Sequence, residues 1–132
     1  MKIGISGSKT FENKIKIKSF IYRLKEYGND ITIVGLGGKD GADRHIRKYA
    51  LELGYKYVEA NPPHTPCNLY SLMAESFYNK PYSPKNFHVR NKIFASFIDK
   101  CVLFDDTGGT DKTLANLISQ LKKARKNPVI IS

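Results

Sequence analysis

The stretch I-T-I-V-G-L-G-G-K-D-G-A-D, residues 31–43, contains a strand pattern, a turn and the start of a helix pattern, and it indicates the fold class of this chain. It begins with a short apolar run typical of a buried strand (residues 31–34) and then turns through a glycine-rich loop. A helical pattern follows over residues 42–53, with apolar side chains on one face and Gly54 as the stop signal. The apolar face consists of Ile46, Tyr49, Ala50 and Leu53. A strand joined through a tight turn to an amphipathic helix is the unit from which α/β folds are built.

The same unit repeats along the chain. Strands are predicted at residues 2–6, 31–34, 55–60, 101–104 and 128–131. Helices are predicted at residues 13–27, 42–53, 86–99 and 113–125, the first of them ended by Gly28 and Asn29. Apolar strands that alternate with amphipathic helices predict an α/β, doubly wound, Rossmann-like fold. We expect a mostly parallel sheet of five or slightly more strands, with helices on both faces.

Residues 61–87 depart from this alternation. The segment N-P-P-H-T-P (residues 61–66) contains three prolines, which fix the backbone and remove hydrogen-bond donors, so no regular element is expected there. A short helix is predicted over residues 69–78, cut off from the next helix by Pro81 and Pro84. We therefore expect an irregular lid at residues 61–87. The aromatic rings in or beside it, which either stack on a ligand or pack within the loop, belong to His64, Tyr70, Tyr78, Tyr82 and His88.

Length and charge limit the classes of function. With 132 residues, the chain has the size of one domain, spanning residues 1–132. Its 22 Lys and Arg against 12 Asp and Glu give a net charge of +10, which makes single-stranded nucleic-acid binding one interpretation. Residues 1–66 carry 12 basic and 7 acidic side chains and residues 67–132 carry 10 and 5, so each half has a net charge of +5. This even distribution favours a solvated surface over a nucleic-acid site.

Other classes are disfavoured by what the sequence lacks. No apolar run approaches the roughly 18–20 residues that a membrane span requires. The first residues show no signal-peptide pattern, so we expect a cytoplasmic protein without a membrane partner. Cys67 and Cys101 lie far apart and have no histidine at ligand spacing. Both are therefore expected to be reduced, and neither a metal nor another cofactor is predicted.

Three glycine-containing loops follow predicted strands and precede helices. They are G-S-K-T at residues 7–10, G-G-K-D-G at 37–41 and T-G-G-T at 107–110. Because the carboxyl ends of parallel strands meet at one edge of a sheet, we expect these loops to gather there and offer N–H groups to a phosphate. No Walker sequence occurs, and the dinucleotide spacing G-x-G-x-x-G is absent after the first strand.

Two charged residues near these loops each have two interpretations. Asp43 is predicted either as a helix cap or as a ligand contact. Arg90 is predicted either as a phosphate ligand or as a surface ion-pair partner.

Four motifs, in order and spacing, resemble the SLOG superfamily. This Rossmann-like group contains the LOG (lysine decarboxylase-like) phosphoribohydrolases, DNA-processing protein A and small stand-alone YspA-type members, which the chain resembles in particular. The motifs are G-S-K-T-F at 7–11, V-G-L-G-G-K-D-G-A-D at 34–43, R-N at 90–91 and F-D-D-T-G-G-T at 104–110. The resemblance implies a single SLOG-like nucleotide-binding domain. The nucleotide-binding residues that it implies are Gly7, Ser8, Lys9, Gly37, Gly38, Gly41, Asp43, Arg90, Asn91, Gly108, Gly109, Thr110 and Thr113.

One departure from the resembled pattern bears on activity. LOG-type hydrolases carry P-G-G-x-G-T and, shortly after it, a catalytic glutamate, whereas here no proline precedes the glycines and Lys112 stands in the place of the glutamate. Asp105, Asp106 and Asp111 are alternative carboxylates, and nothing in the sequence selects one, so the catalytic residue is left unassigned.

The first hypothesis for the function is therefore a sensor or sequestering protein that binds a nucleotide or a nucleotide-derived small molecule. The alternatives are a nucleoside 5′-monophosphate N-glycosidic hydrolase and a single-stranded nucleic-acid-binding protein. We also consider a homodimer.

Overall fold

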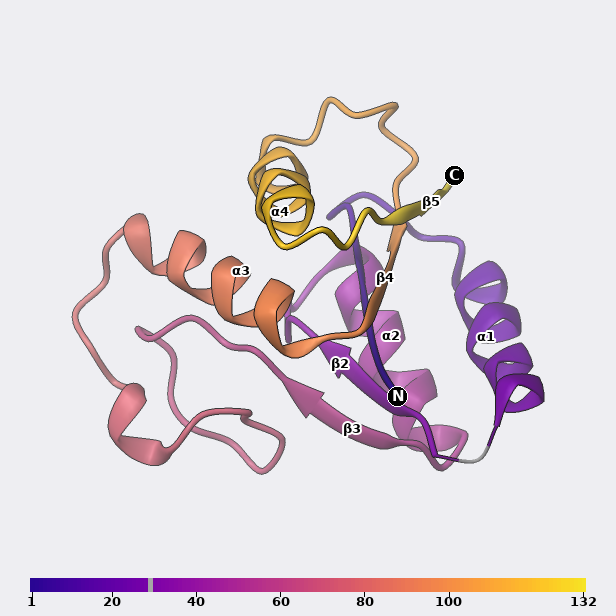
Figure 1. Ribbon diagram of the computed structural model, residues 1–132, viewed down its shortest axis with the longest axis horizontal. Coiled ribbons are helices and arrows are strands. Elements are labelled where there is room, and N and C mark those ends of the chain that lie inside the picture. The colour runs from indigo at the N-terminus through magenta and orange to yellow at the C-terminus, as the bar shows by residue number, and fades with distance from the viewer. Residues whose placement is uncertain (29) are drawn as a thin grey trace.

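Five parallel strands form the central sheet of the computed structural model, which describes residues 1–28 and 30–132 (Figure 1). The strands are β1 (Lys2–Gly7), β2 (Thr32–Gly35), β3 (Lys56–Glu59), β4 (Lys100–Phe104) and β5 (Val129–Ile131). Their order across the sheet is β3-β2-β1-β4-β5, and every neighbouring pair is parallel. This arrangement confirms the predicted doubly wound, Rossmann-like fold. Asn29, predicted as part of a helix stop signal, lies outside the described residues.

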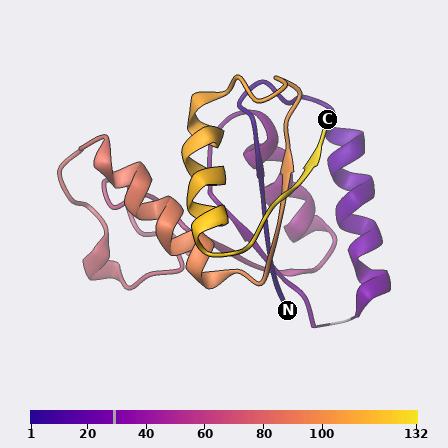
Figure 2. The same cartoon turned by 45° about the horizontal axis from the view of Figure 1, so that its top comes forward.

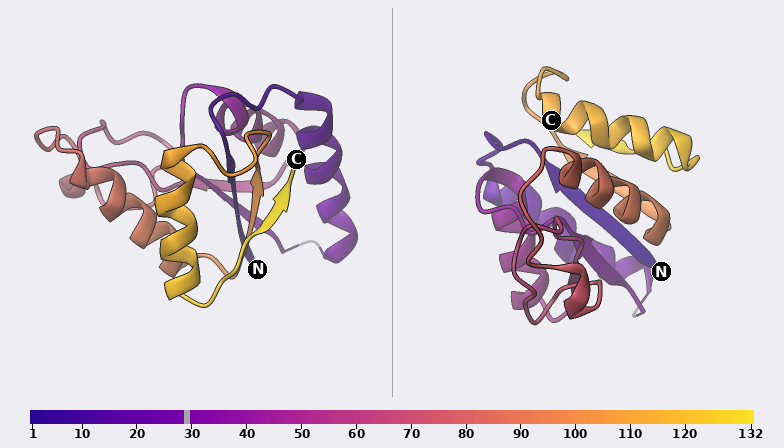
Figure 3. Two further views of the ribbon diagram at one scale, coloured as in Figure 1. Left: turned by 90° about the horizontal axis from the view of Figure 1, so that it is seen from above. Right: turned by 90° about the vertical axis from the view of Figure 1, so that its left-hand side faces the viewer.

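Helices cover both faces of the sheet. On one face α1 (Lys14–Arg23) packs against α2 (Gly41–Glu52), and on the other α3 (Lys85–Phe97) packs against α4 (Lys112–Lys123) (Figure 3). The helix predicted over residues 13–27 changes after α1 into a 3-10 helix, η1 (Leu24–Tyr27). The other predicted long helices end within two residues of their observed bounds. No helix in the described part of the chain is long and apolar enough to span a membrane.

Alternation of side chains along β1 divides the core between the two faces. Ile3 and Ile5 belong to the buried cluster that includes α1 and α2. Gly4 faces the other helices, because a Cβ atom there would lie 2.5 Å from the Phe94 Cζ atom and 2.7 Å from a methyl group of Ile98. The absence of a side chain at Gly4 therefore lets α3 pack directly against the central strand.

The chain changes direction across the sheet between β1 and β4. From β1 it winds outward through β2 to β3, and it then returns through α3 to β4, on the other side of β1. The loops that follow β1 and β4 thus lead to helices on opposite faces, and Figure 2 shows the two loops together at the top of the molecule. In a doubly wound sheet, ligands bind in the crevice that opens at such a switch point.

Between β3 and α3 the chain extends beyond the edge of the sheet (Figure 1). The short helix predicted over residues 69–78 is wrong: Leu72 N–H donates to the Glu59 carbonyl oxygen at 2.8 Å, so the chain runs alongside β3 before one turn of 3-10 helix, η2 (Glu75–Phe77). The cause is Asn68, whose Oδ1 atom accepts a hydrogen bond from Tyr70 N–H at 2.8 Å and whose Nδ2 atom donates to Glu59 Oε1 at 3.2 Å. This local hydrogen bonding overrides the helical spacing of the apolar residues.

Candidate functional site

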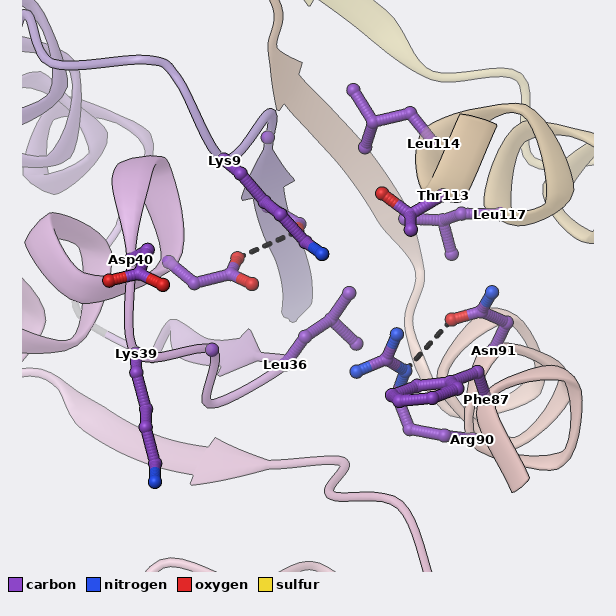
Figure 4. A pocket seen from close by; sticks show the side chains of 14 residues that line it. Lys9, Leu36, Lys39, Asp40, Phe87, Arg90, Asn91, Thr113, Leu114 and Leu117 are labelled. Carbon is purple, nitrogen blue, oxygen red and sulfur yellow. Dashed lines mark hydrogen bonds between the residues drawn. The ribbon is translucent and has the colours of Figure 1, made fainter. Parts of the chain in front are cut away.

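A cavity of about 230 Å³ opens at the carboxyl end of β1, between the start of α2 and the helices α3 and α4 (Figure 4). It lies at the switch point between β1 and β4, where the fold predicts a ligand. The predicted nucleotide-binding residues that line it are Gly7, Lys9, Gly38, Asp43, Arg90, Asn91 and Thr113. The fold thus brings residues from distant motifs of the sequence into one hollow.

The carboxylate of Asp43 forms the acidic side of this cavity. Ser6 Oγ donates a hydrogen bond to Asp43 Oδ1 at 2.7 Å. Burial raises the pKa of Asp43 to about 6, against the opposing effects of the Ser6 hydrogen bond, the Arg90 charge and the Gly38 N–H group, while the Glu59 charge raises it further. A carboxyl group with this pKa exchanges its proton close to neutral pH, as acid–base groups in functional sites do.

Close contact between two loops places Asp43 at this position. Gly41 begins α2 with a φ of 60°, and Ala42 N–H donates to the Ser8 carbonyl oxygen at 3.2 Å. A Cβ atom at Gly41 would lie 2.3 Å from the Lys9 carbonyl oxygen. Glycine meets both demands, the positive φ and the close approach, and it fixes the first turn of α2 against the loop after β1.

Arg90, which lines the same cavity as Asp43, forms its basic side, and Figure 4 shows the guanidinium pointing into it. Its Nε atom donates to Oδ1 of Asn91 at 2.9 Å, and its guanidinium lies over the Phe87 ring, 5.5 Å from the centroid. Asn91 is only 2% exposed, and its Nδ2 atom donates in turn to Asn116 Oδ1 at 2.9 Å. Burial lowers the pKa of Arg90 and the Asp43 charge raises it. Because an arginine stays protonated in proteins, the cavity contains a positioned cation.

A second cation extends toward the same space. Figure 4 shows the Lys9 side chain reaching from the loop after β1 toward the middle of the cavity, whereas Lys39 points away. Among the described residues, no carboxylate lies within 4.0 Å of the charged groups of Lys9 or Arg90. Both cations are therefore available to an anionic ligand. The apolar part of the wall consists of Leu36, Phe87, Leu114 and Leu117.

The third glycine loop lies beside the cavity and makes several hydrogen bonds within itself. The buried carboxylate of Asp105 accepts hydrogen bonds from Thr107 N–H at 2.8 Å and from Gly109 N–H at 3.1 Å. Thr110 Oγ1 donates to the Thr107 carbonyl oxygen at 2.9 Å. Gly108, Gly109 and Thr110 are exposed and do not line the cavity. The N–H groups of Thr107 and Gly109 are thus used within the loop, and the turn lies to one side of the cavity.

The remaining predicted residues support the cavity without lining it. Ser8 is fully buried, and its Oγ atom donates to Asp106 Oδ1 at 3.0 Å, which joins the loops after β1 and β4. At Gly37, where φ is 69°, a Cβ atom would lie 2.4 Å from Nδ2 of Asn61. Gly41 has the packing role described above. These three residues hold the loops that form the cavity.

The three alternative carboxylates all have structural partners. Asp105 holds the turn after β4, and Asp106 accepts hydrogen bonds from two hydroxyl groups of the loop after β1. Asp111 caps α4 by accepting a hydrogen bond from Thr113 N–H at 3.0 Å. Partial burial alone would raise the pKa of Asp111, but the hydrogen bonds from Thr113 hold it below its usual value. None of the three lines the cavity, whereas Asp43 does.

Phe87 is the residue of the predicted lid, 61–87, that lines the cavity. Its ring packs edge-to-face on His64, with centroids 5.2 Å apart, and His64 packs on Tyr82 at 4.9 Å. Asn86 Nδ2 lies 3.1 Å from His64 Nδ1. This aromatic cluster joins the proline-rich start of the segment to the start of α3, beside the cavity.

Several lining residues were not predicted as part of the site. Ser6 gives a weak signal, a hydroxyl group at the end of an apolar strand, whereas Leu114 and Leu117 were read only as the core face of their helix. Phe87 has no signal of its own, because its position depends on how α3 packs. The lining residues not named as nucleotide-binding are Ser6, Leu36, Lys39, Asp40, Phe87, Leu114 and Leu117, although Lys39 and Asp40 belong to the glycine loop at 37–41 that was expected at this edge.

No family model and no curated protein matches this chain. Its sheet order and helix arrangement define a Rossmann-like fold, and solved structures of other proteins share this fold. The molybdenum cofactor carrier protein (Moco carrier protein) of Chlamydomonas reinhardtii matches with a TM-score of 0.61 and 18% identity, over 98% of this chain and 75% of that chain. A second structure of that carrier protein gives a TM-score of 0.62 at 16% identity.

The same fold occurs in DNA processing protein A (DprA) of Streptococcus pneumoniae. That match has a TM-score of 0.61 and 16% identity, and it covers 97% of this chain and 58% of the other. At these identities the likeness shows the fold alone. It confirms the Rossmann-like fold that the alternating strands and helices of the sequence predicted.

Proposed function

We propose that this domain binds a phosphorylated small molecule of the nucleotide class in the cavity at the switch point, as a sensor or sequestering protein. The observation that carries the proposal is the Arg90 guanidinium, which points into the cavity and is held by the buried amide of Asn91, with no carboxylate within 4.0 Å in the described chain. An arginine held in this way is suited to a phosphate, because its planar group forms paired charge-assisted hydrogen bonds.

The rest of the cavity offers contacts for the other parts of a nucleotide. Lys9 supplies a second positive charge, and the Asp43 carboxylate can accept hydrogen bonds from ribose hydroxyl groups. Leu36, Leu117 and the Phe87 ring provide apolar surface for a base. The volume of about 230 Å³ lies near the lower end of small-molecule sites, so we expect one nucleotide rather than a dinucleotide cofactor.

The names of the two structural neighbours support binding as the common theme. One is a carrier of the molybdenum cofactor, a small molecule, and the other processes DNA. Because the cavity is small and contains a positioned cation, binding of a small molecule is favoured over binding of DNA for this chain. A short single-stranded oligonucleotide belongs in the ligand panel as the competing candidate, and its binding would weaken steeply with salt.

Thermal unfolding in the presence of ribonucleoside 5′-monophosphates tests the proposal. A ligand at 100 times its Kd stabilises the folded state by about 2.7 kcal/mol, so a true ligand raises the Tm clearly. Arg90→Ala should abolish that increase, whereas Arg44→Ala, an exposed arginine outside the cavity, should retain it. The proposal is wrong if no phosphorylated nucleotide raises the Tm and native mass spectrometry finds none bound to the purified protein.

A second candidate function, N-glycosidic hydrolysis of a nucleoside monophosphate, is favoured by Asp43. Its pKa of about 6 suits a group that donates or accepts a proton near neutral pH. Water would add across the bond between base and sugar, releasing the free base and ribose 5-phosphate. Chromatography of nucleoside monophosphates after incubation tests this activity. We expect Asp43→Asn to abolish any release of base, and absence of release by the unmodified protein would exclude the candidate.

A further inference from the structure

A second hollow, of about 220 Å³, lies between the first turns of α3 and α4. Its outer side chains include His88 and Lys112, and we refer to it as the α3–α4 groove. The groove and the cavity of the proposed site have four lining residues in common: Phe87, Arg90, Asn91 and Thr113. The two hollows are therefore neighbours, and the Arg90 side chain lies at the boundary between them.

We infer that the α3–α4 groove binds a second phosphate group of the same ligand, so that the ligand class is a doubly phosphorylated nucleotide. This inference rests on the proposed function, because the first phosphate is the one held by Arg90 in the cavity. The second phosphate would lie between Arg90 and Lys112.

The charge of the groove supports an anion there. Lys112 and His88 are exposed along it, and no Asp or Glu is among its lining residues. Asp111 precedes Lys112 in the chain, but its carboxylate turns to the start of α4, where it accepts the hydrogen bond from Thr113 N–H at 3.0 Å. Among the described residues, Lys112 has no carboxylate within 4.0 Å. The Lys112 ammonium group therefore offers its charge to a ligand in the groove.

Arg90 has the hydrogen-bond donors to serve both hollows. A guanidinium group carries donors on all three of its nitrogen atoms. Asn91 uses the one on Nε, and the described structure shows no hydrogen bond from either Nη atom. Asn116, which also lines the groove, holds Asn91 at 2.9 Å and so fixes the orientation of the guanidinium. Two phosphate groups can flank a cation that is held only through its Nε side.

Isothermal titration calorimetry with three sets of probes tests the inference. The probes are the 5′-monophosphates, the 5′-diphosphates and the 3′,5′-bisphosphates of the common ribonucleosides. For the base that binds, we expect one doubly phosphorylated form to bind at least about tenfold more tightly than the monophosphate, a difference of about 1.4 kcal/mol. Lys112→Ala should reduce this ratio of affinities to below about twofold. Lys123→Ala removes the same charge from the far end of α4, outside the groove, and should leave the ratio unchanged.

The outcomes separate this inference from the proposed function. If monophosphates bind and both doubly phosphorylated forms bind within twofold of them, the groove has no second phosphate site and the proposed function stands. If the tenfold ratio persists in Lys112→Ala, the second phosphate lies elsewhere and the inference is wrong. If no phosphorylated nucleotide binds, the proposed function fails and the inference fails with it.

Discussion

Oδ1 of Asn91 accepts a hydrogen bond from Nε of Arg90 at 2.9 Å, so a buried amide holds the cation of the cavity. The two residues are adjacent in α3, and the same amide donates to Asn116 in α4. Two helices therefore fix the direction of one guanidinium. Substitutions at Asn91, and at three further positions, Asp43, Gly41 and Asp105, test how such contacts affect stability or ligand affinity.

Replacement of Asn91 by Ala removes the partner of Arg90 Nε and of Asn116 Oδ1. We expect the free energy of unfolding to fall by about 1–3 kcal/mol, because two polar groups lose their hydrogen bond near the core. We also expect ligand affinity to fall although Arg90 is still present. Asn116→Ala leaves the contact between Asn91 and Arg90 intact and should affect affinity less. Urea unfolding and calorimetric titration give the two quantities, and unchanged affinity in Asn91→Ala would contradict the orienting role.

The pKa of Asp43 makes stability depend on pH. In the folded protein burial raises this pKa from 3.8 to about 6, so between these values the folded state binds more protons than the unfolded state. The contribution of Asp43 to the free energy of unfolding therefore decreases as pH rises from about 4 to about 6. Asp43→Asn removes this penalty, and we expect the variant to be more stable than the parent at pH 7.5 by about 3 kcal/mol. Thermal unfolding at several pH values measures the difference, which should vanish near pH 4. An equal difference at every pH would exclude this origin.

Gly41 and Gly108 form a matched pair for testing the contact between two loops. Both have a positive φ, 60° and 66°, but a Cβ atom would meet the Lys9 backbone at Gly41 and nothing within 4 Å at Gly108. Replacement by Ala introduces the same conformational strain at both positions and steric overlap at only one. We expect Gly41→Ala to lower the free energy of unfolding by at least about 2 kcal/mol more than Gly108→Ala does. Similar losses in the two variants would show that the loops can separate without cost.

The turn after β4 depends on one carboxylate. Asp105 accepts hydrogen bonds from Thr107 and Gly109, and its replacement by Ala leaves these groups without an internal partner. We expect a loss of about 2–3 kcal/mol in the free energy of unfolding. Asp30→Ala, at a side chain that is 92% exposed, is the control and should change stability little. If both substitutions have the same effect in urea unfolding, the hydrogen bonds of Asp105 do not stabilise the turn.

The elements of the sheet could be predicted from the sequence because their periodicities are clear. Buried side chains recur at helical spacing in α4, at Leu114, Leu117 and Leu121, and glycines mark the turns after β1 and β2. The helix predicted over residues 69–78 failed because the hydrogen bond from Asn68 to Glu59 depends on a partner outside the segment, at the end of β3. Such tertiary contacts leave no periodic signal.

The site was predicted in part for a similar reason. Positions just after strands bring Lys9, Gly38 and Asp43 to one edge of the sheet, so their meeting follows from topology. Whether a loop N–H group is free for a ligand depends on which side chain already accepts its hydrogen bond. In the turn after β4 that side chain is Asp105, and the letters D-D-T-G-G-T do not reveal it.

The pairing of β1 with β4 joins distant parts of the chain, since Ile3 pairs with Lys100 and Gly7 with Phe104. During synthesis β1 is made before β4, so one of its edges stays without a partner until β4 has also been made. Closing so long a loop is slow, and the cavity takes shape only when it is closed. A bound ligand would therefore protect from degradation only those domains in which β1 and β4 have already paired.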